Sequence, residues 1–145
     1  MPMIRHPEGL IPEVRAKVEQ WHEACLALGV EMLVYCTHRT PIEQEVLYAK
    51  GRTTPGPKVT NAPPWQSWHQ YGMAVDAVPL DAGKPVWRYS AANGLWAVAV
   101  EEGDKAGLEW AGRWKTFREY VHWQYTEGLS LAAAYTQLHP TDGIA

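Results

Sequence analysis

Blocks of basic residues, long apolar runs and clustered cysteines are all missing from this sequence of 145 residues. Thirteen basic residues stand against sixteen acidic ones, and the net charge of −3 gives no general attraction to nucleic acid or anionic membranes. No stretch approaches the ~20 apolar residues of a membrane span, and the N-terminus lacks the apolar core of a signal peptide. We therefore expect synthesis in the cytoplasm, with no nucleic-acid partner and no stable membrane association.

Cysteine is scarce, with only Cys25 and Cys36 in the chain. Cys25 lies in a helical pattern and Cys36 at the end of a strand-like run, which favours buried free thiols over a disulfide. Nothing about these two residues predicts a cysteine metal cluster. The chain is long enough to bury a core without metal or disulfide staples, so we expect one domain over residues 1–145.

Apolar periodicity predicts helices and short strands in mixed order. We expect helices over 12–28, 41–50, 90–106 and 130–138, and strands near 30–36, 73–78, 108–110 and 121–125. Thr40, Pro41 and Glu43 form a predicted capping box, Ser90 is the expected cap of the third helix, and Pro140 is expected to stop the last one. Because no βαβ repeat is present, we predict an α+β domain with a small, mainly antiparallel sheet packed with helices.

Residues 51–65 contain four prolines and two glycines and show no periodicity. Loops longer than about 12–15 residues are usually functional or disordered. This segment leads directly into the histidine at position 69, so we expect it to border a substrate rather than to link two domains.

An acidic residue, Asp76, interrupts the apolar run at 73–78. A carboxylate inside a buried strand is costly unless it is paired, hydrogen-bonded or bound to a metal. His69 precedes it by seven residues, and Gly72 allows the chain to turn between them. His122, in another apolar stretch, can complete the triangle from a neighbouring strand. The spacing is no helical metal-binding signature, so taken alone it leaves an ordinary structural role for the histidines open.

Two imidazoles and one carboxylate can hold one zinc ion and leave a coordination position for water. Zinc lowers the pKa of its water from 15.7 towards roughly 7, so a nearby carboxylate can take the proton at neutral pH. Glu119 lies three residues before His122 and is well placed to be this base. We therefore predict that His69, Asp76 and His122 bind one zinc ion and that Glu119 is catalytic.

The chain also contains a longer pattern, Ser67-x-His69-x-x-Gly72-x-Ala74-x-Asp76 followed by Glu119-x-x-His122. This pattern resembles the signature of the zinc D-alanyl-D-alanine carboxypeptidase family, which includes D-Ala-D-Ala dipeptidases and the L-alanyl-D-glutamate peptidase endolysins of bacteriophages. The segments around Arg39, at 51–53 and at 110–117 resemble the endolysin branch, and the resemblance covers about 30–125. It implies the α+β fold that DD-peptidases share with the Hedgehog signalling domain.

The resemblance also implies roles for single residues. It places zinc on His69, Asp76 and His122, with Glu119 as the catalytic carboxylate. Arg39, at a strand-to-helix junction, is expected to offer a fixed positive charge to the developing oxyanion or to a substrate carboxylate. Its alternative is a surface salt bridge with Glu43 or Glu45. Two further residues are expected on the substrate side, namely Ser67, which could instead support His69, and Gln44.

We therefore expect a zinc-dependent peptidoglycan peptidase, a phage or prophage endolysin that cuts the murein stem peptide at the L-Ala-D-Glu bond. It is expected to be a monomer without a separate wall-binding domain, and to reach the periplasmic wall after a holin opens the membrane. Endolysins of this family often carry aspartate at the catalytic position, so Glu119 keeps a D-Ala-D-Ala carboxypeptidase or dipeptidase open.

Two function classes other than a peptidase fit part of the pattern. A non-haem iron oxygenase uses the same two histidines and one carboxylate. A metal-stabilised binding module without hydrolytic activity fits the Hedgehog-type fold. Glu119 and Arg39 favour hydrolysis over both, because neither alternative needs them.

Overall fold

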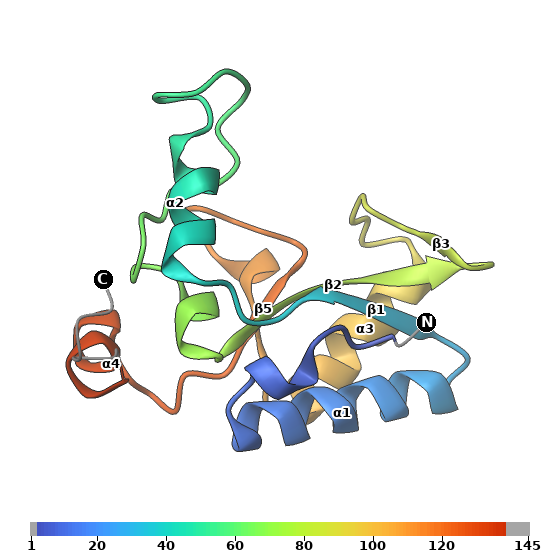
Figure 1. Cartoon of the computed structure of the whole chain (residues 1–145). Helices are drawn as coiled ribbons and strands as arrows, with labels where there is room; N and C mark the ends of the chain where they lie inside the picture. Colours follow the sequence, from blue (N-terminus) through green and yellow to red (C-terminus); the bar gives the residue numbers. More distant parts are fainter. Residues whose placement is uncertain (1–2, 139–145) are drawn as a thin grey trace.

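A small antiparallel sheet carries helices at its face and its ends (Figure 1). The computed structural model describes residues 3–138. Its strands are β1 (Glu31–Cys36), β2 (Ala74–Asp81), β3 (Lys84–Pro85), β4 (Glu109–Trp110) and β5 (His122–Gln124), in the order β1-β2-β5-β4 with β3 paired to β2. Its α-helices are α1 (Pro12–Ala27), α2 (Pro41–Ala49), α3 (Gly94–Lys105) and α4 (Leu131–Leu138). The predicted α+β class is confirmed, while the expected stop at Pro140 lies outside the described residues.

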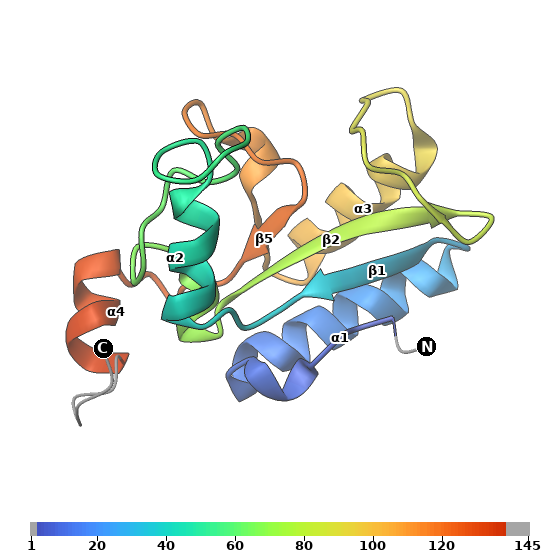
Figure 2. The same cartoon turned by 45° about the horizontal axis from the view of Figure 1, so that its top comes forward.

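Helices α1 and α3 lie side by side along the sheet, whereas α2 and α4 lie beyond one end of it (Figures 1 and 2). The buried face of α1 is formed by Val14, Val18, Trp21 and Cys25, at the spacings of three and four that predicted the helix. Cys25 is a free thiol in the core.

Among the described residues, no helix is both long and apolar enough to cross a membrane.

Four tryptophans form the centre of the core. Trp123 of β5 stacks on Trp96 and Trp110, with ring centroids 6.4 and 5.7 Å away, and its ring lies 4.5 Å from that of Trp21. The Trp21 indole donates a hydrogen bond to the Ala99 carbonyl at 2.9 Å, so this buried N–H is satisfied. Because Trp123 directly follows His122, this packing fixes the strand that carries the histidine.

The helix that follows β1 begins as the sequence predicted. The Thr40 hydroxyl accepts a hydrogen bond from the Glu43 amide at 3.0 Å, and the Glu43 carboxylate accepts one from the Thr40 amide at 2.8 Å. Both hydrogen bonds of a capping box are therefore present, with Pro41 in the first turn. This cap sets the direction in which α2 leaves the sheet.

Two predicted boundaries were wrong. Strand β2 continues through Pro79 to Asp81 instead of ending at 78. Pro79 lies between β5 and β3, the two short partners on that edge, where its missing N–H is tolerated. Helix α3 begins at Gly94 instead of Ser90, because the Asn93 side chain accepts hydrogen bonds from the Leu95 and Trp96 amides.

Candidate active site

Three side chains of the site lie in one row across the sheet. Asp76 of β2 is directly opposite His122 of β5 on one side and Cys36 of β1 on the other. Residues paired across antiparallel strands project from the same face. The sheet thus brings together His122 and Asp76, although 45 residues lie between them in the sequence.

His69 reaches the same point from the short 3-10 helix η2 (Trp68–Tyr71), which precedes β2. The Ser67 hydroxyl caps η2 by accepting from the His69 amide at 3.3 Å. Gly72 ends it with φ 69°, and a Cβ there would lie 2.6 Å from the Gly9 carbonyl oxygen, so only glycine fits. The predicted turn between His69 and Asp76 is therefore built from η2 and Gly72.

The free ring nitrogens of both histidines converge on one carboxylate oxygen. Nε2 of His69 lies 3.2 Å and Nδ1 of His122 3.6 Å from Oδ1 of Asp76. The opposite nitrogens are anchored: Nδ1 of His69 donates to the Thr37 carbonyl at 2.7 Å, and Nε2 of His122 faces Oε1 of Gln124 at 2.7 Å. Each anchor can only accept a hydrogen bond, so a neutral imidazole keeps its proton on the anchored nitrogen and turns the lone pair of the converging nitrogen toward a metal.

The charge at this point also fits a cation. Burial raises the pKa of Asp76, but the charge of His69 and the hydrogen bonds from both histidines outweigh it and hold the pKa far below its usual range. Burial lowers the pKa of His69, yet the charge of Asp76 and its hydrogen bond raise it to about 10. Both shifts favour an ionised Asp76 beside a positive charge, which is the charge arrangement that a zinc ion would also provide. Two imidazole nitrogens and one carboxylate are a zinc donor set.

Cys36 offers a second possible donor set with His69 and Asp76. Its sulfur lies 3.9 Å from Nδ1 of His69 and accepts a hydrogen bond from Nη2 of Arg39 at 3.4 Å. Nδ1 is already bonded to the Thr37 carbonyl, whereas Nε2 is directed at Asp76. Either set can use Nε2 and leave this anchor intact, but only the set with His122 has the two imidazoles and one carboxylate of an open catalytic zinc site.

Glu119 lies at the rim of the site. Its Oε2 is 3.7 Å from Nδ1 of His122, and its side chain is 43% exposed. A carboxylate in this position can exchange protons with water while staying close to a metal held by His122. The structure thus places Glu119 beside the three converging side chains, where a general base could act.

Arg39 and Gln44 form a network behind the site. Nη2 of Arg39 donates to Oδ2 of Asp76 at 3.3 Å, and Nη1 donates to Oε1 of Gln44 at 2.8 Å. Gln44 in turn donates to the Ala62 carbonyl at 2.7 Å and to Thr60 at 3.4 Å. Arg39 therefore orients Asp76 instead of pairing with Glu43 or Glu45. Gln44 is 0% exposed, so the structure gives it a supporting position and no access to a substrate.

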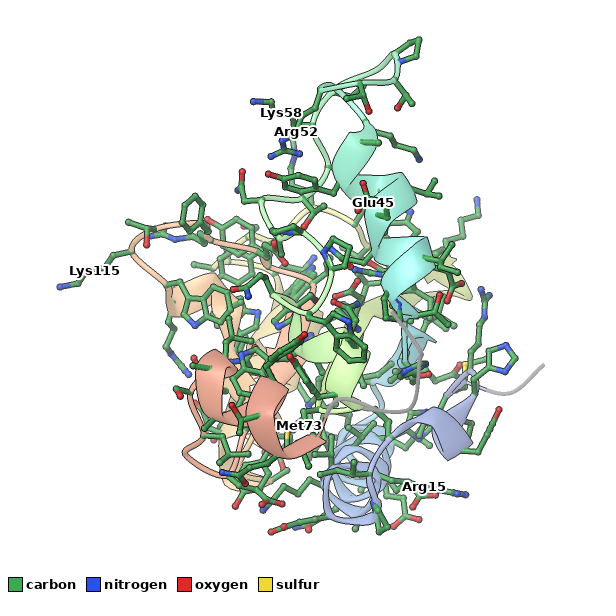
Figure 3. The ribbon with its side chains drawn as sticks, turned by 60° about the vertical axis from the view of Figure 1, so that its left-hand side comes forward. Arg15, Glu45, Arg52, Lys58, Met73 and Lys115 are labelled. Carbon is green, nitrogen blue, oxygen red and sulfur yellow. The ribbon has the colours of Figure 1, made fainter. Side chains whose placement is uncertain are left out.

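A cavity of about 480 Å³ opens over these groups. Its walls come from the 51–65 loop, from η2, and from the segment between β4 and β5, and include Tyr35, Arg39, Val59, Thr60, Ala62, Ser67, Trp114, Glu119 and Val121. Figure 3 shows Arg52 and Lys58 on the loop and Lys115 on the segment between β4 and β5, with Met73 labelled near the buried start of β2. The 51–65 loop thus borders the cavity, and Ser67 both lines the cavity and caps η2.

Sequence reasoning missed four residues around the site. Thr37 and Gln124 anchor the histidines, Trp114 packs on the His122 ring at 5.5 Å, and Tyr35 lines the cavity. Only Gln124 left a signal, because it lies two residues after His122 in a strand and so shares its face. The others depend on contacts between distant segments.

Known proteins are similar in sequence to much of this chain. A family model described as D-alanyl-D-alanine carboxypeptidase matches residues 60–125. The chain is 34% identical over 122 residues to the peptidoglycan L-alanyl-D-glutamate endopeptidase CwlK of Bacillus subtilis (strain 168). That match covers 80% of this chain and 73% of the relative.

Solved structures share the fold at lower identity. The L-Ala D-Glu endopeptidase ChiX of Serratia marcescens is 23% identical with a TM-score of 0.59, and the match covers 84% of each chain. A mutant of the vancomycin-resistance D,D-pentapeptidase VanY in complex with Zn(II) is 18% identical with a TM-score of 0.58, over 88% of this chain and 79% of that one. These likenesses confirm the predicted DD-peptidase-like fold.

The sequence match and the fold agree on one family. The region matched by the family model includes His69, Asp76, Glu119 and His122. Since the chain covers most of a relative that is 34% identical, the relationship extends beyond this motif. The chain belongs to the D-alanyl-D-alanine carboxypeptidase family of metallopeptidases, as the sequence pattern predicted.

Proposed function

We propose that this peptidase is zinc-dependent and hydrolyses the L-alanyl-D-glutamate bond of the peptidoglycan stem peptide, with one zinc ion on His69, Asp76 and His122. The observation that carries the zinc site is the convergence of two anchored imidazoles on one carboxylate oxygen. The bond is inferred from the relative that is 34% identical, whose name is that of a peptidoglycan L-alanyl-D-glutamate endopeptidase.

The residues of this chain divide the chemistry between them. A bound zinc ion supplies Lewis acidity, which lowers the pKa of water and stabilises negative charge on a carbonyl oxygen. Glu119 accepts the proton of the water that attacks the scissile carbonyl and returns it to the leaving amine. Arg39 holds Asp76 by its hydrogen bond at 3.3 Å and adds positive charge to the cavity wall.

A second candidate within the family is a D-Ala-D-Ala carboxypeptidase. The description of the matching family model and the glutamate at position 119 favour it. The oxygenase and binding-module alternatives are not favoured, because the chain belongs to a peptidase family. The two remaining candidates differ in their products and not in their metal site.

The test is mass spectrometry of purified peptidoglycan digested by the zinc-loaded protein, beside Glu119→Ala and chelator-treated controls. Fragments that end in L-alanine, together with new D-glutamate amino termini, are the expected result. Loss of terminal D-alanine alone would assign the carboxypeptidase activity instead. The absence of any zinc-dependent product would contradict the peptidase proposal.

We further propose that the protein acts as a monomeric phage endolysin with a single catalytic domain over residues 1–145, released to the wall by a holin. Support comes from the resemblance of the segments at 39–40, 51–53 and 110–117 to phage endolysins. Expression in a Gram-negative host with and without a holin tests this role, because only the combination should clear the culture. Clearing without a holin, or none with it, would contradict the release route.

A further inference from the structure

Strand β1 contains an irregularity directly beside the site. Val34 pairs with Ala77 and Cys36 pairs with Asp76, so two steps along β1 match one step along β2. Tyr35 is therefore the extra residue of a β-bulge. Bulges next to active sites redirect side chains. Here the bulge keeps Val34 in the core while Cys36 joins the row of Asp76 and His122.

The bulge also places the Tyr35 side chain in the wall of the active-site cavity, which Asp76, Glu119 and His122 line as well. Its ring is held from outside by Trp87, edge to face, with ring centroids 5.3 Å apart and planes at 73°. No hydrogen bond of the Tyr35 hydroxyl to another residue is present in the described part of the chain, 3–138. A phenol on a cavity wall without such a partner is available to a ligand.

The other strong donor of this wall is already occupied. Arg39 donates from Nη1 to Gln44, and from Nη2 to Asp76 and to the sulfur of Cys36. Asp76 and Glu119 are carboxylates, which can only accept hydrogen bonds when ionised. Tyr35 therefore offers a substrate carbonyl a hydrogen-bond donor that Arg39 and the two carboxylates do not supply.

We propose that Tyr35 is a further catalytic residue, whose hydroxyl donates a hydrogen bond to the scissile carbonyl oxygen as negative charge develops there. This role rests on the proposed function, because it assigns a donor to the same cleavage site. The phenol keeps its proton throughout and contributes only the hydrogen bond. Burial and the nearby charge of Asp76 raise its pKa well above the usual range, so the donor is present at any working pH.

The test compares Tyr35→Phe with wild type on purified muropeptides, using zinc-loaded protein. Phenylalanine keeps the ring against Trp87 and removes only the hydroxyl. Loss of one such donor lowers kcat by about a hundredfold, so we expect that fall with KM changed less than about twofold. The matched control is Tyr89→Phe, which changes a tyrosine of the aromatic cluster that does not line the cavity.

A second measurement separates this role from a structural one. A phosphinate dipeptide matched to the bond that wild type cleaves should lose affinity for Tyr35→Phe by the same factor as kcat/KM, at unchanged zinc content. If Tyr35→Phe cleaves as fast as wild type, or no slower than Tyr89→Phe, the role of Tyr35 is overturned while the proposed function stands. If zinc-loaded wild type cleaves nothing, the proposed function fails and this role with it.

Discussion

The two sides of the active-site cavity are built in opposite ways. The sheet side consists of β2, β5 and η2, where His69 and His122 are buried and each has its second nitrogen anchored. The rim side consists of the 51–65 loop and the segment between β4 and β5, where Glu119 is 43% exposed. The proposed metal ligands thus lie on buried strands and a short helix, and the proposed proton carrier lies where water can reach it.

This difference suggests that metal binding and turnover can be altered separately. Changes on the sheet side should remove the metal and with it all activity. Changes on the rim side should leave the metal in place and slow the reaction. Variants on the two sides can therefore test whether metal binding and turnover are separable.

The largest effect is expected on the sheet side, from Asp76→Ala. It removes the carboxylate on which both imidazoles converge, so zinc should be lost, and activity should fall below about one part in 10³. Zinc content by elemental analysis and muropeptide cleavage measure the two losses. Asp81→Ala, at the exposed end of the same strand, is the control. Full zinc occupancy in Asp76→Ala would contradict the assigned ligand set.

On the rim, Glu119→Gln should retain zinc while kcat falls by about 10²–10⁴, the usual contribution of a general base. The amide keeps the shape of the side chain but cannot take a proton. Zinc content and kcat are measured on one preparation, with Glu101→Gln, an exposed residue of α3, as the control. If zinc and activity disappear together, the division between the two sides is wrong.

Competition between zinc and a proton for His69 gives a further test of the sheet side. The pKa of His69 is raised to about 10 in the metal-free protein, so at pH 7 zinc must displace a proton from Nε2. Zinc affinity should therefore rise about tenfold per pH unit and level off as the pH passes the His69 pKa. Calorimetry in buffers of different ionisation enthalpy should show about one proton released per zinc at neutral pH. Affinity independent of pH between 6 and 9 would contradict this protonation state.

The smallest effect is expected from Gln44→Ala. It removes the side chain that links Arg39, beside Asp76, to the 51–65 loop. Arg39, Thr60 and the Ala62 carbonyl lose their common partner, which should destabilise the fold by about 1–3 kcal/mol. We expect kcat/KM to fall about tenfold with zinc retained, because the loop and Arg39 are displaced and no ligand is removed. Denaturant unfolding and kinetics measure both, with exposed Gln20→Ala as control. Unchanged kinetics would show that the link is structural only.

Local signals in the sequence predicted much of the scaffold. The capping box at Thr40, the helical spacing around Trp21 and the acidic residue in the strand at Asp76 each depend on neighbours within a few residues. The family resemblance predicted which residues gather at the site, and the structure brings His69, Asp76, Glu119 and His122 together.

What sequence could not predict depends on pairing between distant segments. The bulge at Tyr35 exists only in the register of β1 against β2, and the burial of Gln44 only in the packing of α2 against the loop. Asn93 caps α3 in place of the expected Ser90. Strand β2 continues past the expected end at 78, because a gap between two short partner strands accommodates Pro79. Register and packing of this kind are not visible in a local pattern.

The tryptophan stack has an optical consequence. The rings of Trp21, Trp96 and Trp110 all lie within 6.4 Å of Trp123, close enough for their excited states to couple. Their coupling should give a near-ultraviolet circular dichroism signal that persists while the core is intact. Trp114 lies apart from this stack and against His122, so its fluorescence should respond to a metal there. In one sample, Trp114 fluorescence should therefore follow loss of metal, and near-ultraviolet circular dichroism should follow loss of the fold.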